Sequence, residues 1–169
     1  MAEYNILNYL KTEDFLTISA ALTSLTSIFY FTNSAFACGT ITLFIAAAID
    51  FLDGMLARRR GNTTEFGRNL DFLQDTITYC VAVAVLLQLT IDAWWMIYFI
   101  ILLVSASLVR LARQQLVKSE EKQYVGLPVT FNLLLPLMYL FGVANPLAHA
   151  GLITILSILM LSHKKFRFI

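Results

Sequence analysis

Residues 50–75 read DFLDGMLARRRGNTTEFGRNLDFLQD, a charged stretch that lies between two long apolar ones. The apolar stretch Ala37–Ala57 leads into it, and Phe72–Ile91 follows from it. A helix needs about 20 mostly apolar residues to cross the hydrocarbon core of a membrane, and each flanking stretch has about that length. The pattern therefore predicts two membrane-crossing helices joined by a short polar loop.

The composition of the whole chain also indicates a membrane protein. Hydrophobic residues make up 59% of the 169 residues, charged residues make up 14%, and the mean hydropathy is +0.73. Soluble domains carry about 25% charged residues, so a soluble globule is excluded. The net charge of +1 gives no basic surface for nucleic acid. Cys38 and Cys80 lack metal-ligand spacing and are predicted core residues, whereas His149 and His163 are predicted surface residues.

Six apolar stretches qualify, or nearly qualify, as membrane spans, and turn-like breaks separate them. We predict an all-α polytopic fold with six transmembrane helices in a single domain, residues 1–169. Residues 1–12 are a candidate interfacial helix. The predicted spans are Phe15–Phe31, Ala37–Ala57, Phe72–Ile91, Trp94–Val109, Leu127–Val143 and Leu147–Leu161.

The basic residues are distributed asymmetrically. If six spans leave both termini on one side, all 12 Lys and Arg residues lie on that side, and Asp92 is the only formal charge in the opposite loops. The positive-inside rule assigns the basic side to the cytoplasm. We therefore expect a multi-pass protein of the cell membrane, with both termini and residues 50–75 on the cytosolic side.

Four aspartates stand at the facing ends of two predicted spans. Asp50 and Asp53 end one span, and Asp71 and Asp75 begin the next. Spacings of three and four residues place each pair on one helix face. Carboxylates inside a membrane span are costly and need a partner or a metal ion, and four of them together would repel one another unless cations were present. Oxygen ligation favours Mg²⁺, Mn²⁺ or Ca²⁺, and two such ions would explain the set.

Small residues and an arginine accompany these aspartates. Gly54 follows Asp53, where a missing side chain lets a ligand approach the backbone, and Ala57 keeps the same face open one turn later. Arg58 offers a planar fork for phosphate oxygens. Two metal ions, an arginine and small residues describe a pyrophosphate site. The alternative is that the aspartates only cap helices and pair with the nearby arginines, Arg58, Arg59, Arg60 and Arg68.

The spacing Asp50-x2-Asp53-Gly54-x2-Ala57-Arg58-x8-Gly67-x3-Asp71-x3-Asp75 resembles the signature of the CDP-alcohol phosphatidyltransferase family, and all eight fixed positions match. The resemblance implies a six-helix membrane fold, a homodimer, and a cytosol-facing cavity that holds two divalent cations, Mg²⁺ or Mn²⁺, and the CDP group. It implies that a small alcohol displaces CMP from a CDP-linked lipid.

The resemblance also implies a role for each matched residue. The four aspartates look like the metal ligands, and Asp75 also looks like the general base for the incoming hydroxyl group. Thr64 and Thr17 lie outside the signature and also look like nucleotide-site residues, although the asparagine that usually neighbours such a threonine as Thr17 is Asp14 here. The residues that look like CDP contacts are Gly54, Ala57, Arg58, Thr64, Gly67 and Thr17. No Ser, Cys or His is placed as a covalent nucleophile, so we expect one direct displacement.

Three local features look like the phosphatidylserine synthase branch and favour L-serine as the alcohol: Glu65-Phe66-Gly67 before Leu70-Asp71, Arg110-Leu111-Ala112-Arg113, and Gly126-Leu127-Pro128. Arg110 and Arg113 lie three residues apart on one helical face at the cytosolic boundary, where they could bind the acceptor carboxylate or the lipid phosphate. The alternative for both arginines is snorkelling to the membrane surface.

Other residues depart from that branch. Phe72, Gln74 and Tyr79 replace its usual residues near the expected acceptor cavity. Inositol phosphate and glycerol phosphate therefore remain alternative acceptors. A divalent-cation transporter is an alternative of a different class, but it would need polar residues across the whole bilayer depth, whereas the acids cluster at one end of the spans. A catalytically silent scaffold would have no reason to keep such unfavourable charges.

Overall fold

The computed structural model describes residues 12–60, 64–116, 124–143, 145–162 and 165–166, and side chains for 14–56, 64–115, 126–143 and 145–162. The candidate interfacial helix at residues 1–12 lies outside this part of the chain, except for its last residue, where the first helix begins.

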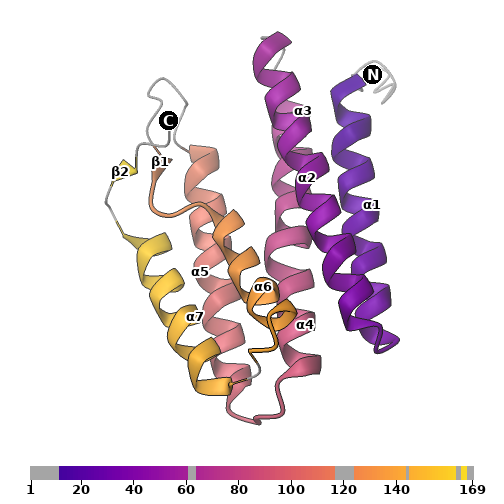
Figure 1. Ribbon diagram of the computed structural model, residues 1–169. Helices are drawn as coiled ribbons and strands as arrows, with labels where there is room; N and C mark the ends of the chain where they lie inside the picture. The colour runs from indigo at the N-terminus through magenta and orange to yellow at the C-terminus, as the bar shows by residue number, and fades with distance from the viewer. Residues whose placement is uncertain (1–11, 61–63, 117–123, 144, 163–164, 167–169) are drawn as a thin grey trace, which may run out of the picture.

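The helices of the described residues form six rods, which run alongside one another (Figure 1). Two of them change helix type along their length: a π-helical segment, Thr76–Val81, joins α3 to α4, and a 3₁₀ segment, Val129–Leu133, leads into α6. The bounds are α1 Thr12–Thr32, α2 Phe36–Arg60, α3 Glu65–Asp75, α4 Ala82–Thr90, α5 Met96–Leu116, α6 Leu134–Leu140 and α7 Pro146–Leu161. The two-residue strands β1 (Tyr124–Val125) and β2 (Lys165–Phe166) form one antiparallel pair.

The all-α prediction is confirmed, but the six helices differ in length. Four are long and apolar enough to cross a membrane: Asp14–Thr32, Phe36–Leu56, Glu65–Thr90 and Met96–Gln115. Val129–Leu140 and Pro146–Leu161 are apolar but shorter than a usual span. Four spans are therefore supported by length and composition, and the prediction of six remains a prediction.

Local chemistry explains how the rods reverse direction. The turn from α1 to α2 places Ser34 at a φ of 61°, and Gly39 then packs so closely on α1 that a Cβ there would lie 2.5 Å from two ring carbons of Phe31. At the start of α7, the Asn145 side chain accepts a hydrogen bond from the Leu147 amide at 2.9 Å. These turns place the end of α2, the beginning of α3 and the ends of α5 and α7 at the end of the bundle where α1 begins (Figure 1).

The third rod, Glu65–Thr90, lies in the interior and packs against both α1 and α5. Cys80 on this rod is buried as predicted, but Cys38 is exposed, so its assignment to the core was wrong. The surface prediction for His149 was also wrong: its side chain is 2% exposed, and Nδ1 lies 3.0 Å from the carbonyl oxygen of Asn145. Packing in the bundle buries the face of α7 that carries His149 and Ser157, and the small contrast between the faces of this largely apolar helix does not indicate it.

Candidate functional site

Three of the four predicted carboxylates meet at one point. Asp50 on α2 and Asp71 and Asp75 on α3 each offer an oxygen, and these oxygens lie within 4.8 Å of one another. The four-residue step from Asp71 to Asp75 places both on one face of α3. Oxygens this close together could serve as ligands of one divalent cation, which these three side chains would hold. An all-oxygen set suits a hard divalent cation, and the residues fit the predicted metal.

The fourth carboxylate, Asp53, lies against α1. Its side chain is 5% exposed and accepts a hydrogen bond from the hydroxyl of Thr17, which is 4% exposed. Asp53 interacts electrostatically with Asp50, one turn away on the same helix. Among the described residues, Asp53 is not a member of the three-carboxylate group. The structure thus brings Thr17 next to the predicted metal ligands, although 36 residues separate it from Asp53.

Some of the residues predicted to contact the CDP group make local packing or capping contacts, and others have no described side chain. Thr64 is the N-cap of α3, and its Oγ1 accepts the amide of Gly67 at 3.0 Å. A Cβ on Gly67 would lie 3.0 Å from an oxygen of Asp14 and 3.1 Å from that of Thr64, so this turn packs closely on α1. Gly54 is half-buried on α2. The side chains of Ala57 and Arg58–Arg60 lie outside the described part of the chain.

A tyrosine that was not among the predicted site residues contacts the acidic cluster, the group formed by Asp50, Asp71 and Asp75. The Tyr79 hydroxyl donates to Oδ2 of Asp50 at 2.7 Å, and Tyr79 is 2% exposed. The available signal was its spacing, because Asp71, Asp75 and Tyr79 follow one another at four-residue steps. Tyr79 lies in the π-helical segment, a geometry that often occurs at functional sites.

The two arginines predicted to bind the acceptor have different surroundings. Arg110 is buried on α5, interacts electrostatically with Asp75, and donates to the side chain of Gln114. Arg113 donates to the carbonyls of Met160 and Ser162, each at 3.2 Å. These carbonyls belong to the end of α7, where an arginine commonly satisfies the last acceptors of a helix. Arg110 therefore lies by the acidic cluster, whereas Arg113 joins α5 to α7.

The sequence matches the model of the CDP-alcohol phosphatidyltransferase family over residues 11–163. The chain belongs to the CDP-alcohol phosphatidyltransferase family. The resemblance drawn from the eight-residue signature is thereby confirmed.

Curated relatives of this transferase include two archaeal proteins that match 96% of its length. The chain is 28% identical over 167 residues to the archaetidylserine synthase of Methanothermobacter thermautotrophicus, covering 72% of that protein. It is 25% identical over 163 residues to the CDP-diacylglycerol–serine O-phosphatidyltransferase of Methanocaldococcus jannaschii, covering 77% of that protein. A third relative, the CDP-diacylglycerol–glycerol-3-phosphate 3-phosphatidyltransferase of Bacillus subtilis, is 36% identical over 63 residues, which are 37% of this chain and 33% of that protein.

Two residues that depart from the serine branch are engaged in helix packing in this transferase. Gln74 is buried, and its Nε2 donates to the Thr78 hydroxyl at 3.0 Å. That hydroxyl lies 2.6 Å from the hydroxyl of Ser24, so the three side chains connect α1 to the third rod. Phe72 is partly buried and packs against the hydrophobic core. Both residues therefore take part in packing the third rod against its neighbours.

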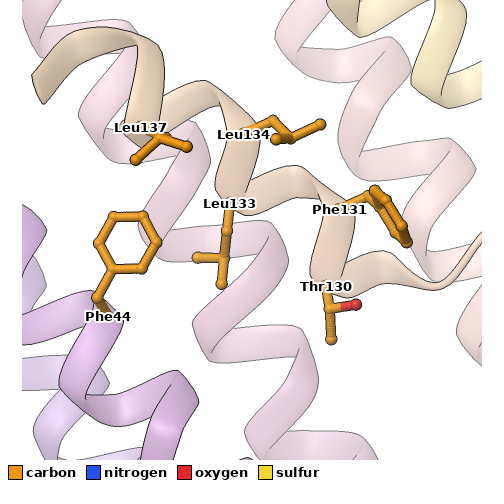
Figure 2. A pocket seen from close by; sticks show the side chains of 6 residues that line it. All are labelled: Phe44, Thr130, Phe131, Leu133, Leu134 and Leu137. Atoms are coloured by element: carbon orange, nitrogen blue, oxygen red, sulfur yellow. The ribbon is translucent and has the colours of Figure 1, made fainter. Parts of the chain in front are cut away.

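An apolar groove of about 220 Å³ lies between α2 and the rod that contains α6 (Figure 2). Apart from the Thr130 hydroxyl, its lining is hydrocarbon: Phe44, Thr130, Phe131, Leu133, Leu134 and Leu137. Phe44 precedes Asp50 by six residues on α2, a rise of about 9 Å. The transferase thus has an apolar concavity less than two helical turns from its acidic cluster.

Proposed function

We propose that this transferase displaces CMP from a CDP-linked lipid with L-serine, forming phosphatidylserine or its ether-lipid analogue. The observation that carries this proposal is the meeting of Asp50, Asp71 and Asp75 oxygens within 4.8 Å on helices long and apolar enough to cross a membrane. Carboxylates within a membrane are costly unless a cation or another partner offsets their charge, so this cluster favours bound cations. The names of the two archaeal relatives that match 96% of the chain support serine as the acceptor.

The proposed setting is a single membrane domain, residues 1–169, with six crossings in the cell membrane and a cytosolic polar cavity. With six crossings, all 12 Lys and Arg residues would lie on one side, and this asymmetry supports the cytosolic orientation. The two shorter helices would need polar ends inside the protein or a locally thinner bilayer. We also propose a homodimer, as the family resemblance implies.

The proposed metal ligands are Asp50, Asp53, Asp71 and Asp75, which together would hold two divalent cations, Mg²⁺ or Mn²⁺. When bound, such cations supply positive charge that offsets the pyrophosphate and stabilises departing CMP. The proposed CDP contacts are Gly54, Ala57, Arg58, Thr64, Gly67 and Thr17. Thr17 is supported by its hydrogen bond to Asp53, because that contact ties α1 to one of the proposed metal ligands.

The chain's own residues would then carry out one displacement. Asp75 takes the proton of the serine hydroxyl as its oxygen forms a bond to the lipid-side phosphorus. The bond from that phosphorus to the CMP oxygen breaks, and CMP leaves with the electron pair. Arg110, buried beside Asp75, binds the carboxylate of serine through charge-assisted hydrogen bonds. Arg113, three residues further along α5, holds this end of α5 against the end of α7, and the apolar groove receives a lipid chain.

Measurement of CMP release tests the proposal. The purified protein is incubated with Mn²⁺ and either CDP-diacylglycerol or its diether analogue, and serine, glycerol phosphate and inositol phosphate are supplied in separate reactions. We expect release that depends on serine. Release with glycerol phosphate alone would keep the reaction and overturn the acceptor. Absence of release in every reaction, from folded protein, would refute the proposed function.

A further inference from the structure

The side chain and the backbone of Tyr79 each form a hydrogen bond with another helix. Its hydroxyl donates to Asp50 of α2 at 2.7 Å. Its backbone carbonyl accepts a hydrogen bond from Nδ2 of Asn132 at 2.9 Å, and the same Nδ2 lies 2.9 Å from the hydroxyl of Ser107 on α5. All three residues, Tyr79, Asn132 and Ser107, are at most 2% exposed. The tyrosine is therefore fixed from two elements outside its own helix.

The π-helical segment explains why the carbonyl of Tyr79 can be held in this way. In this segment the hydrogen bonds span five residues, as in the bond from the Ala82 amide to the Ile77 carbonyl. Such a segment disturbs the regular pairing of the helix and makes a carbonyl available to an outside donor. Asn132, which precedes α6 within the 3₁₀ segment, supplies that donor.

The hydrogen bond from the Tyr79 hydroxyl affects how the Asp50 carboxylate would bind a cation. A carboxylate has two oxygens with about four acceptor sites, and rotation of the group changes which of them face the cluster. A donor at Oδ2 restricts that rotation and leaves acceptor sites for a metal ion. Outer contacts of this kind orient metal ligands, and their loss typically lowers metal affinity about 10- to 100-fold.

We infer that Tyr79 is a positioning residue for the metal site: its hydroxyl, anchored through Asn132 and Ser107, sets the orientation of the Asp50 carboxylate toward Asp71 and Asp75. This inference rests on the proposed function, because it takes Asp50 to be a metal ligand.

The test compares Mn²⁺ binding to the wild-type protein and Tyr79→Phe in detergent, with free Mn²⁺ measured by electron paramagnetic resonance. Phenylalanine keeps the buried ring and removes only the hydroxyl. We expect the Kd for Mn²⁺ to rise about 10- to 100-fold. The matched control is Tyr98→Phe, which removes the same hydroxyl from a side chain that is 64% exposed on α5. We expect this control to bind Mn²⁺ like the wild type.

The outcomes separate the inference from the proposed function. If the wild-type protein does not bind Mn²⁺, both fail. If it binds and Tyr79→Phe binds equally well, with or without a lower melting temperature, Tyr79 serves packing alone and only the inference fails. If Tyr79→Phe does not fold, 3-fluorotyrosine is placed at position 79 of the otherwise unchanged chain. Its fluorine resonance should then shift on Mg²⁺ binding, and an unchanged resonance would overturn the inference.

Discussion

The hydrogen bond from Thr17 to Asp53 gives the sharpest test of how α1 contributes to the site. Both side chains are at least 95% buried, because their exposed fractions are 4% and 5%. The substitution Thr17→Val removes the hydroxyl and keeps the β-branched shape, so the helix and its packing are little changed. A hydrogen bond to a charged group contributes about 1.5–3 kcal/mol. Each 1.4 kcal/mol is about tenfold in an equilibrium constant, so the loss of this hydrogen bond corresponds to a change of about 10- to 150-fold in an equilibrium constant that depends on it.

This loss should be measurable as weaker binding of CDP in the presence of Mn²⁺, by calorimetry on the protein in detergent. We expect the Kd for CDP to rise by at least about tenfold in Thr17→Val, because Asp53 would lose the donor that fixes it beside Asp50. The matched control is Thr26→Val on the same helix, where the lost hydroxyl donates only to the Leu22 carbonyl on the exposed side. Equal CDP affinities in the two variants would refute the reasoning.

Five other substitutions test the remaining assignments in three experiments. Asp75→Asn should lower turnover about 10²- to 10⁴-fold while CDP binding persists, and near-normal turnover would exclude Asp75 as the base. Arg110→Ala should raise the KM for serine about tenfold or more, whereas Arg113→Ala should mainly lower the melting temperature by freeing the carbonyls at the end of α7; identical profiles would contradict this division. Gly39→Ala should destabilise the protein by about 1–3 kcal/mol because its Cβ would lie 2.5 Å from a ring of α1. Gly151→Ala, with no atom within 4 Å of its Cβ, should be neutral or stabilising in thermal unfolding.

The features that could be predicted from the sequence are those set by neighbours along the chain. Apolar length predicted the helices, and the four-residue step from Asp71 to Asp75 predicted one shared face, because helical periodicity depends only on sequence spacing. Asp50 was predicted to join them because only a short loop separates its helix from theirs. The eight-residue signature led to the family, which the match over residues 11–163 confirms.

Helix type and side-chain partners within these helices were harder to predict. The 3₁₀ segment that leads into α6 and the π-helical segment before α4 carry no distinct hydrophobic period, so the apolar stretches suggested ordinary helices there. Arg113 was placed with Arg110 by spacing, yet it bonds carbonyls 47 and 49 residues away. His149 was predicted on the surface, but it is buried where α7 packs in the bundle.

Composition, periodicity and fixed spacing are properties of the chain, and they are enough to identify an α-helical membrane transferase of this family and the aspartates of its acidic motif. The contacts of Thr17 with Asp53, across 36 residues, and of Tyr79 with Asp50, across 29, exist only in the folded bundle. These contacts depend on the rotation and depth of one helix against another. That register is set by packing among many side chains at once, which no local pattern specifies.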